Sequence, residues 1–213
     1  MTRPFRFATL ASIPAAVFAI AAVCPAYAAD NDNDKFKVDP GVFIGKAGDC
    51  GPTPGSRIVG AAWVKDMGLP DTHGIDSEAL ILSKNGATAD CSAAGASLKG
   101  VKGITLTEIG FDIRNGGHCG AGAPRFNVQA TDGFHFLGGC ANATQTPNTP
   151  QAGWTRVRID PSNPAQAFPP IAPGAKIISI DIVFDEGVDT GPDFSGIAVL
   201  DNIDVNGVLV GRR

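Results

Sequence analysis

The sequence predicts an all-β fold, an antiparallel β-sandwich of jelly-roll type, from three observations. The 213 residues include 27 Gly and 16 Pro but only 18% charged residues, a composition that argues against a coiled coil or a helical bundle. From about residue 43 onward, short apolar runs are separated by turn residues. Several runs also alternate between apolar and polar residues, which is typical of antiparallel sheets that bury one face.

The expected strands follow one another with turn signals between them. They cover residues 57–65, 79–84, 104–114, 125–130, 134–138, 154–160, 176–184 and 196–205. The fourth and fifth form a hairpin around 131–133. In 176–184, the shared apolar face holds Ile178, Ile180, Ile182 and Phe184. The Ala-rich segment 87–98 is expected to hold at most a short helical turn. Seven or eight strands of this length suit a jelly roll.

The first 28 residues have the form of a secretory signal peptide. Arg3 and Arg6 precede an uncharged apolar run over 8–23, and 26–28 has the A-x-A form of a cleavage site. The run is short of the ~20 residues that a membrane anchor needs. A lipid anchor on Cys24 is a further alternative, but a large Val23 stands where bacterial processing uses a small residue. We therefore expect a secreted protein, periplasmic or extracellular, with no membrane span.

The predicted organisation is a signal peptide (1–28), a flexible acidic lead-in (29–42) and one β-sandwich domain (43–213). Cleavage removes two arginines and no acidic residue, so the net charge moves from −4 to −6. It also removes the only Tyr, at position 27. An acidic domain of this kind is not expected to bind nucleic acid.

Four cysteines remain after cleavage: Cys50, Cys91, Cys119 and Cys140. An even number in a secreted chain predicts two disulfides, for which three pairings are possible. Cys119 and Cys140 flank the predicted hairpin, so we expect them to pair with each other and to leave Cys50 with Cys91. The chain has no C-x-x-C, which argues against zinc.

The second half of the chain resembles secreted jelly-roll modules. WTRVRID (154–160) and a Pro-rich loop precede KIISIDIVFDEG (176–187) and GIAVLDNIDVNG (196–207). This order is similar to the last strands of galactose-binding-like sandwiches, many of which are carbohydrate-binding modules. CGAGAPRFNV and FHFLGGC also resemble uncharacterised secreted bacterial proteins. The resemblance spans about residues 57–207 and implies a galactose-binding-like topology and a glycan ligand.

Three aspartates are candidate ligands for a structural Ca²⁺, the one candidate cofactor. Asp201 is expected in an inward row with Val199, Ile203 and Val205, where a carboxylate needs a partner. In the modules that the chain resembles, an acid at this place often joins a Ca²⁺ site. Asp185 and Asp189 lie in the loop 185–193, which has four acids. For Asp201 the alternatives are an error of register or a carboxylate bonded to backbone amides. For the loop 185–193 the alternative is a solvated acidic turn.

A polar sheet face is the candidate ligand-binding surface. The residues expected to point away from the core are Arg114, Arg125, Asn127, Gln129, His135, Trp154, Arg156 and Arg158. Guanidinium and amide groups beside an aromatic ring suit a polyol or an acidic glycan. Relatives commonly stack sugars on Trp or Tyr, so Trp154 is the expected platform, and an ordinary solvated face is the alternative.

Catalytic motifs such as G-x-S-x-G and H-E-x-x-H are absent from the sequence, and no close acidic pair lies on one inward strand. His118 precedes Cys119 in a Gly-rich loop and is expected at the surface. We therefore expect a secreted, non-catalytic binding module whose partner is a glycan or cell-surface polymer. The alternatives are an adhesive envelope protein that binds protein partners, and a small extracellular hydrolase or lyase.

Overall fold

Two antiparallel sheets make up the protein, which confirms the predicted all-β sandwich. The computed structural model describes residues 35–70, 77–148, 151–191 and 193–210, so the predicted signal peptide lies outside the described residues. Sheet A has the strand order β1 (Lys37–Ile44), β4 (Ser92–Lys99), β11 (Ile177–Phe184), β6 (Arg125–Ala130), β7 (Gly133–Gly138) and β10 (Ala167–Phe168). Sheet B has the order β2 (Val59–Val64), β3 (Ala79–Lys84), β12 (Ile197–Val205), β5 (Ile109–Arg114), β9 (Trp154–Ile159) and β8 (Thr144–Pro147), and β13 (Val208–Val210) pairs with β12.

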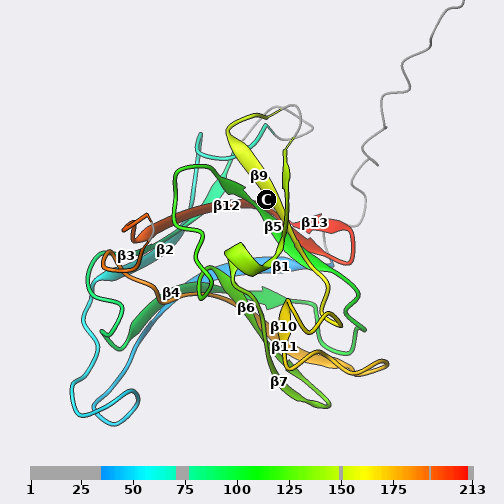
Figure 1. Cartoon of the computed structure of the whole chain (residues 1–213), viewed down its shortest axis with the longest axis horizontal. Coiled ribbons are helices and arrows are strands. Elements are labelled where there is room, and N and C mark those ends of the chain that lie inside the picture. The colour runs from blue at the N-terminus through cyan, green and yellow to red at the C-terminus, as the bar shows by residue number, and fades with distance from the viewer. Residues whose placement is uncertain (1–34, 71–76, 149–150, 192, 211–213) are drawn as a thin grey trace, which may run out of the picture. The chain divides into compact units, whose positions relative to one another are not determined.

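The hydrophobic core lies between the two sheets, which Figure 1 shows as two layers. Alternate residues of each strand point into it, as the two-residue period of a strand requires. Phe126 of sheet A meets Phe111 of sheet B, with ring centroids 5.7 Å apart. The jelly-roll and galactose-binding-like details of the topology stay a prediction.

All eight expected strands are present. Five further strands were not expected, namely β1, β4, β8, β10 and β13, and β4 is the one of these that lies inside a sheet with another strand on each side. In the segment 87–98, a short turn is present at 87–90, where Asp90 N–H donates to Ala87 O at 3.1 Å, but residues 92–99 form a strand between β1 and β11 that was not expected. Ser92, Ala94 and Ala96 point inward, yet the outward residues of this strand are equally small. The hydrophobic contrast that marks a half-buried strand is therefore missing from its sequence.

Part of the flexible lead-in predicted over 29–42 is an ordered strand. β1 begins at Lys37 and pairs with β4 along its whole length. Phe36 and Val38 belong to the core, so burial of apolar side chains fixes this segment. Residues 29–34 lie outside the described part of the chain.

Two irregular strands correct the expected inward rows. β11 shifts register between Ile177 and Ser179, so Ile177 is in the core and Ile178 is 46% exposed. β12 shifts register between Asp201 and Asp204, where Asn202 has a φ of 44°. A β-bulge changes the face to which later residues point, and a strict alternation in the sequence does not reveal it.

Both expected disulfides are present. Cys119–Cys140 links the loop before β6 to the short 3₁₀ helix η1 (Cys140–Asn142) after β7, and so closes the base of the β6–β7 hairpin. Cys50–Cys91 links the loop after β1 to the residue before β4. Over the described residues, no helix has the length and apolar character needed to cross a membrane.

Candidate ligand-binding face

The residues of the predicted polar face divide between the two sheets. Arg125, Asn127 and Gln129 lie on β6 of sheet A, and Trp154, Arg156 and Arg158 lie on β9 of sheet B. In each strand the intervening residues point into the core, so the two sets face outward on opposite sides of the sandwich. The structure therefore does not bring the six residues together, and the two outer faces differ in character.

The outer face of sheet B is covered at Trp154. This side chain is only 8% exposed and packs with Leu69, Ala79 and Val199 in a second apolar cluster. The segment after β2 that contains Leu69 lies over it. Trp154 is therefore not the exposed stacking platform that its position on a polar strand face predicts.

A buried carboxylate lies beside Trp154 on the same face of sheet B. Asp112 Oδ2 accepts hydrogen bonds from the side-chain amides of Asn148 (2.7 Å) and Asn202 (2.9 Å). Its Oδ1 accepts one from Arg156 Nε (3.3 Å) and lies 3.6 Å from a guanidinium nitrogen of Arg158. Arg156 and Arg158 therefore balance a buried charge, which is the usual condition for keeping an ionised carboxylate inside a protein.

Asp201 lies on this covered face and not in the inward row, so its predicted placement is wrong. The core residues of β12 are Ala198, Leu200, Ile203 and Val205, because of the bulge described above. Asp201 accepts hydrogen bonds from the backbone N–H of Leu69 (Oδ2, 2.6 Å) and of Asn202 (Oδ1, 2.6 Å). This is the backbone-bonded alternative. A Cβ at Gly68 would lie 2.6 Å from Asp201 Oδ2, so the close approach of the covering segment requires glycine.

The outer face of sheet A exposes aromatic side chains, and β7 supplies two of them. His135 and Leu137 of β7 point toward the core and are almost fully buried. Phe134 and Phe136 point outward and are 45% and 42% exposed. The imidazole of His135 hydrogen-bonds Pro169 O (2.9 Å) and Asp132 Oδ1 (3.1 Å). His135 was expected on the outside, so this strand is inverted relative to its prediction.

Phe168 of the neighbouring β10 extends the aromatic group. It is 47% exposed and lies directly opposite Phe136 in the β7–β10 ladder. Phe134 and Phe136 meet edge to face, with centroids 5.1 Å apart, and the guanidinium of Arg125 lies 5.2 Å from the Phe136 centroid. We name Phe134, Phe136 and Phe168 the aromatic cluster. The F-x-F spacing of residues 134 and 136 is the sequence signal that would have found two of its members.

Cross-strand pairing aligns polar residues with the aromatic cluster. One row runs across the outer face of sheet A through Asp39, Ser97, Asp181, Asn127, Phe136 and Phe168. A parallel row contains Ser179, Gln129 and Phe134. Strands lie about 4.8 Å apart, so a row across six strands spans about 24 Å. Asn127 and Gln129 thus stand directly beside exposed phenylalanine side chains.

Arg125 is held in place by the loop that follows β11. Asp185 binds its guanidinium with both carboxylate oxygens, at 2.6 and 2.8 Å. In the same loop Asp189 Oδ1 accepts hydrogen bonds from the backbone N–H and hydroxyl of Thr88, both at 2.7 Å. The buried ammonium of Lys84 donates to the carbonyl oxygens of Asp185, Thr88 and Asp90. Burial lowers the pKa of Lys84, although the nearby Asp185 partly opposes this effect.

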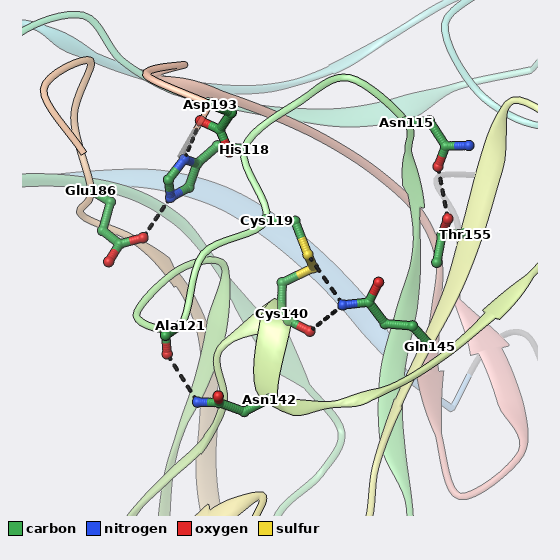
Figure 2. Close-up of a disulfide and its surroundings, with 10 residues drawn as sticks. All are labelled: Asn115, His118, Cys119, Ala121, Cys140, Asn142, Gln145, Thr155, Glu186 and Asp193. Atoms are coloured by element: carbon green, nitrogen blue, oxygen red, sulfur yellow. Dashed lines mark hydrogen bonds and ion pairs between the residues drawn. A yellow bond between two sulfur atoms is a disulfide. The ribbon is translucent and has the colours of Figure 1, made fainter. Parts of the chain in front are cut away.

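His118 is the side chain that anchors this loop, and its predicted surface position is wrong. It is fully buried between two carboxylates of the loop (Figure 2). Its Nε2 lies 2.5 Å from Glu186 Oε2, and its Nδ1 lies 2.7 Å from Asp193 Oδ1. When both carboxylates are ionised they accept hydrogen bonds, and both ring nitrogens then donate, as in the imidazolium form. The disulfided Cys119 follows it directly and fixes the backbone there.

Two opposing effects set the pKa of His118. Burial lowers it, but the hydrogen bonds and charges of Glu186 and Asp193 outweigh burial, so the pKa of His118 lies above its usual 6.5. Burial in turn raises the pKa of Asp193. Hydrogen bonds from His118 and from the Ser195 amide outweigh this and hold the pKa of Asp193 below its usual 3.8. The four acids of the loop therefore serve as acceptors for particular partners, and the loop is not a freely solvated turn.

The three candidate calcium ligands do not lie in one place. Asp201 binds amides on the outer face of sheet B, while Asp185 and Asp189 bind Arg125 and Thr88 beside sheet A. In the part of the chain that the structure describes, no three His, Cys, Asp or Glu side chains are arranged to hold a metal ion. Calcium binding stays a prediction.

No family model, curated protein or solved structure matches the chain.

Proposed function

We propose that the protein is a non-catalytic binding module that holds a glycan, or a similar hydroxyl-rich surface polymer, across the outer face of sheet A. One observation carries this proposal: β7 exposes two phenylalanines and buries a histidine. A strand that only had to cover the core would do the reverse. Local departures of this kind from the folding pattern are expected at functional sites.

The arrangement of side chains supports a glycan over a purely apolar ligand. Sugar rings offer C–H groups that pack on aromatic rings, and hydroxyl groups that bond to amides. Asn127 stands opposite Phe136, and Gln129 stands opposite Phe134. A site with apolar platforms and a few placed polar groups is typical of small-molecule and saccharide recognition. The ~24 Å width of the face leaves room for several sugar units along one row.

The two disulfides support the extracellular setting of this proposal. Disulfides persist in oxidising compartments and are rare in the cytosol. We therefore propose that the predicted signal peptide directs the chain out of the cytoplasm, where a surface glycan is accessible.

A glycan array tests the proposal, using the protein expressed from its full sequence and purified after export. We expect binding that weakens at least about tenfold in Phe136→Ala, because central aromatic residues carry much of a binding energy. Phe194→Ala is the matched control, since Phe194 is 65% exposed in the loop after β11 and is not part of sheet A. Silence across the array contradicts the proposal, as does full binding by the Phe134→Ala, Phe136→Ala double variant.

A second candidate function is adhesion to a protein partner, and the free edge of sheet A favours it. Among the described residues β1 pairs only with β4, and Val42 and Phe43 near its end are both 51% exposed. An uncovered edge strand with apolar residues can pair with a strand from another chain. A self-association that is detected by sedimentation and abolished by Val42→Lys favours this candidate, provided that the array is silent.

A further inference from the structure

We propose that the glycan bound by sheet A is anionic, and that Lys37 and Lys99 with the adjacent Lys102 bind its negatively charged groups. This inference rests on the proposed function, since it names the chemical class of the ligand on the same face. The charge-dependent part of the binding energy comes from ammonium groups at one end of sheet A, at some distance from the aromatic cluster on β7 and β10.

Lys37 and Lys99 carry the inference because they are directly opposite each other. They are cross-strand partners at the end of the β1–β4 ladder. Their neighbours Val38 and Leu98 point into the core, so both lysines point outward on the same face, and both are exposed. Like charges that face each other across two strands destabilise a sheet. A bound anion between the two ammonium groups removes that repulsion.

No described acidic residue balances this pair. The nearest acids in the ladder are Asp39 and Asp181, which both stand opposite Ser97, and Asp181 accepts a hydrogen bond from the Ser97 hydroxyl at 2.6 Å. Within the described part of the chain, Lys37, Lys99 and Lys102 form no ion pair or side-chain hydrogen bond. This distinguishes them from Arg125, whose charge is already balanced by Asp185.

The lysines of the protein concentrate at this end of sheet A. Five of the eight lysines in the sequence lie at the start of β1, the end of β4 or the start of β11: Lys35, Lys37, Lys99, Lys102 and Lys176. The chain as a whole is acidic, with a formal net charge of −4. A local excess of positive charge on an acidic protein attracts anions to that place.

A hollow of about 240 Å³ lies beside Lys99, one of the opposed lysines, between the end of β4 and the start of β11. Residues that line it include Ser97, Lys99, Lys102, Ile178, Ser179 and Asp181. Lys99 and Lys102 thus bring two positive charges to the hollow and Asp181 brings one negative charge. The exposed Ile178 offers an apolar surface. The hollow adjoins the row through Ser179, Gln129 and Phe134. A chain that crosses this row places one end on phenylalanine and the other on lysine.

The test compares anionic polysaccharides with neutral ones on the protein purified after export. The probes are polygalacturonate, alginate and hyaluronan. Each is compared with its methyl-esterified form, in which the carboxylates are converted to uncharged esters. We expect the wild type to prefer at least one acidic form and to lose that preference as salt is raised, since salt screens exposed charges. In Lys37→Gln, Lys99→Gln, affinity for the acidic form falls about tenfold, the effect of two surface ion pairs, and affinity for the ester is unchanged.

The same double variant has a second signature that does not depend on the ligand. Removing the repulsion between residues 37 and 99 raises the melting temperature of the free protein, whereas an ordinary structural role would lower it. Lys46→Gln is the matched control, an exposed lysine just beyond the other end of β1. It is expected to change neither melting temperature nor affinity.

Several outcomes overturn the inference. They are a lower melting temperature in the double variant, equal affinity for acid and ester, or tighter binding to phosphatidylserine vesicles than to all three polysaccharides. Failure of the proposed function gives a different result from failure of this inference. In that case Phe134→Ala, Phe136→Ala keeps full affinity for the acidic polysaccharide while the lysine variant loses it, so the charged end binds without the aromatic face.

Discussion

The outer faces of the two sheets differ in which side chains they bury and which they expose. Sheet B buries charge: Asp112 and Asp201 lie under the segment around Leu69 and beside Asn148, and their oxygens accept hydrogen bonds. Sheet A exposes apolar surface: Phe134, Phe136, Phe168 and Ile178 are each more than 40% exposed.

The contrast separates a structural surface from the surface that we propose for binding. A buried charge with satisfied partners destabilises the fold when a partner is lost, but it offers little to a ligand. An exposed aromatic group adds little to folding because much of its area stays in water, and that area is available for binding. The residue types alone placed the arginines and tryptophan of β9 on one binding face with the polar residues of β6, although the two strands lie in different sheets.

The largest expected effect is on sheet B. Asp112→Asn removes the negative charge that balances Arg156 and Arg158. It also replaces the oxygen that accepts hydrogen bonds from Asn148 and Asn202 with an NH₂ group, which cannot accept them. Because breaking a buried ion pair costs about 3–5 kcal/mol, and Arg156 is partly solvated, we expect unfolding by urea to show a loss of about 3 kcal/mol. Asp39→Asn, on an exposed residue, is expected to stay within about 0.5 kcal/mol. A comparable loss in both variants contradicts the contrast.

A smaller effect, dependent on pH, is expected at the loop that borders sheet A. His118→Gln removes hydrogen bonds to Glu186 and Asp193 and is expected to lower the free energy of unfolding by about 2 kcal/mol. The pKa of His118 is raised above 6.5 in the folded state, so its stabilisation is complete below pH 6.5 and is lost as the pH rises through that folded pKa.

Denaturation of wild type and His118→Gln over a pH series measures this effect. The difference between the two proteins should shrink toward alkaline pH. Asp193 limits the stabilisation at acid pH. Its pKa is lowered in the folded state, so the stability that its ionised carboxylate contributes is present above pH 3.8 and is lost as the pH falls through the folded pKa. A difference that grows above pH 8 would show that His118 is neutral in the fold.

The smallest expected effect is on the open face. Phe136→Ser keeps the outward position but removes the ring that meets Phe134 and Arg125. Because the side chain is 42% exposed, we expect the free energy of unfolding to fall by no more than about 1 kcal/mol. Thermal denaturation measures the change. A loss near that of Asp112→Asn would place Phe136 among the structural residues and weaken the proposed function.

Local patterns predicted much of the fold. Eight strands and both disulfides were found because each depends on alternation or on a turn close in the sequence. The β4 strand was missed because Ala, Gly and Ser occupy both of its faces. The site was predicted less well. Asn127 and Gln129 face outward as expected, but the aromatic cluster beside them was not predicted, and His118 was expected at the surface and is buried.

The sequence by itself determined that this chain forms strands and which alternate residues of β6 face out, since these properties follow from short-range periodicity. It favoured one of three possible disulfide pairings, and the structure confirms that one. Only the tertiary structure decided which strands share a sheet, and therefore which outward residues meet. It also decided which face is covered. Bulges in β11 and β12 and the loop over Trp154 depend on contacts between residues far apart in the chain. For that reason an exposed platform was expected at Trp154, whereas the exposed rings are those of β7 and β10.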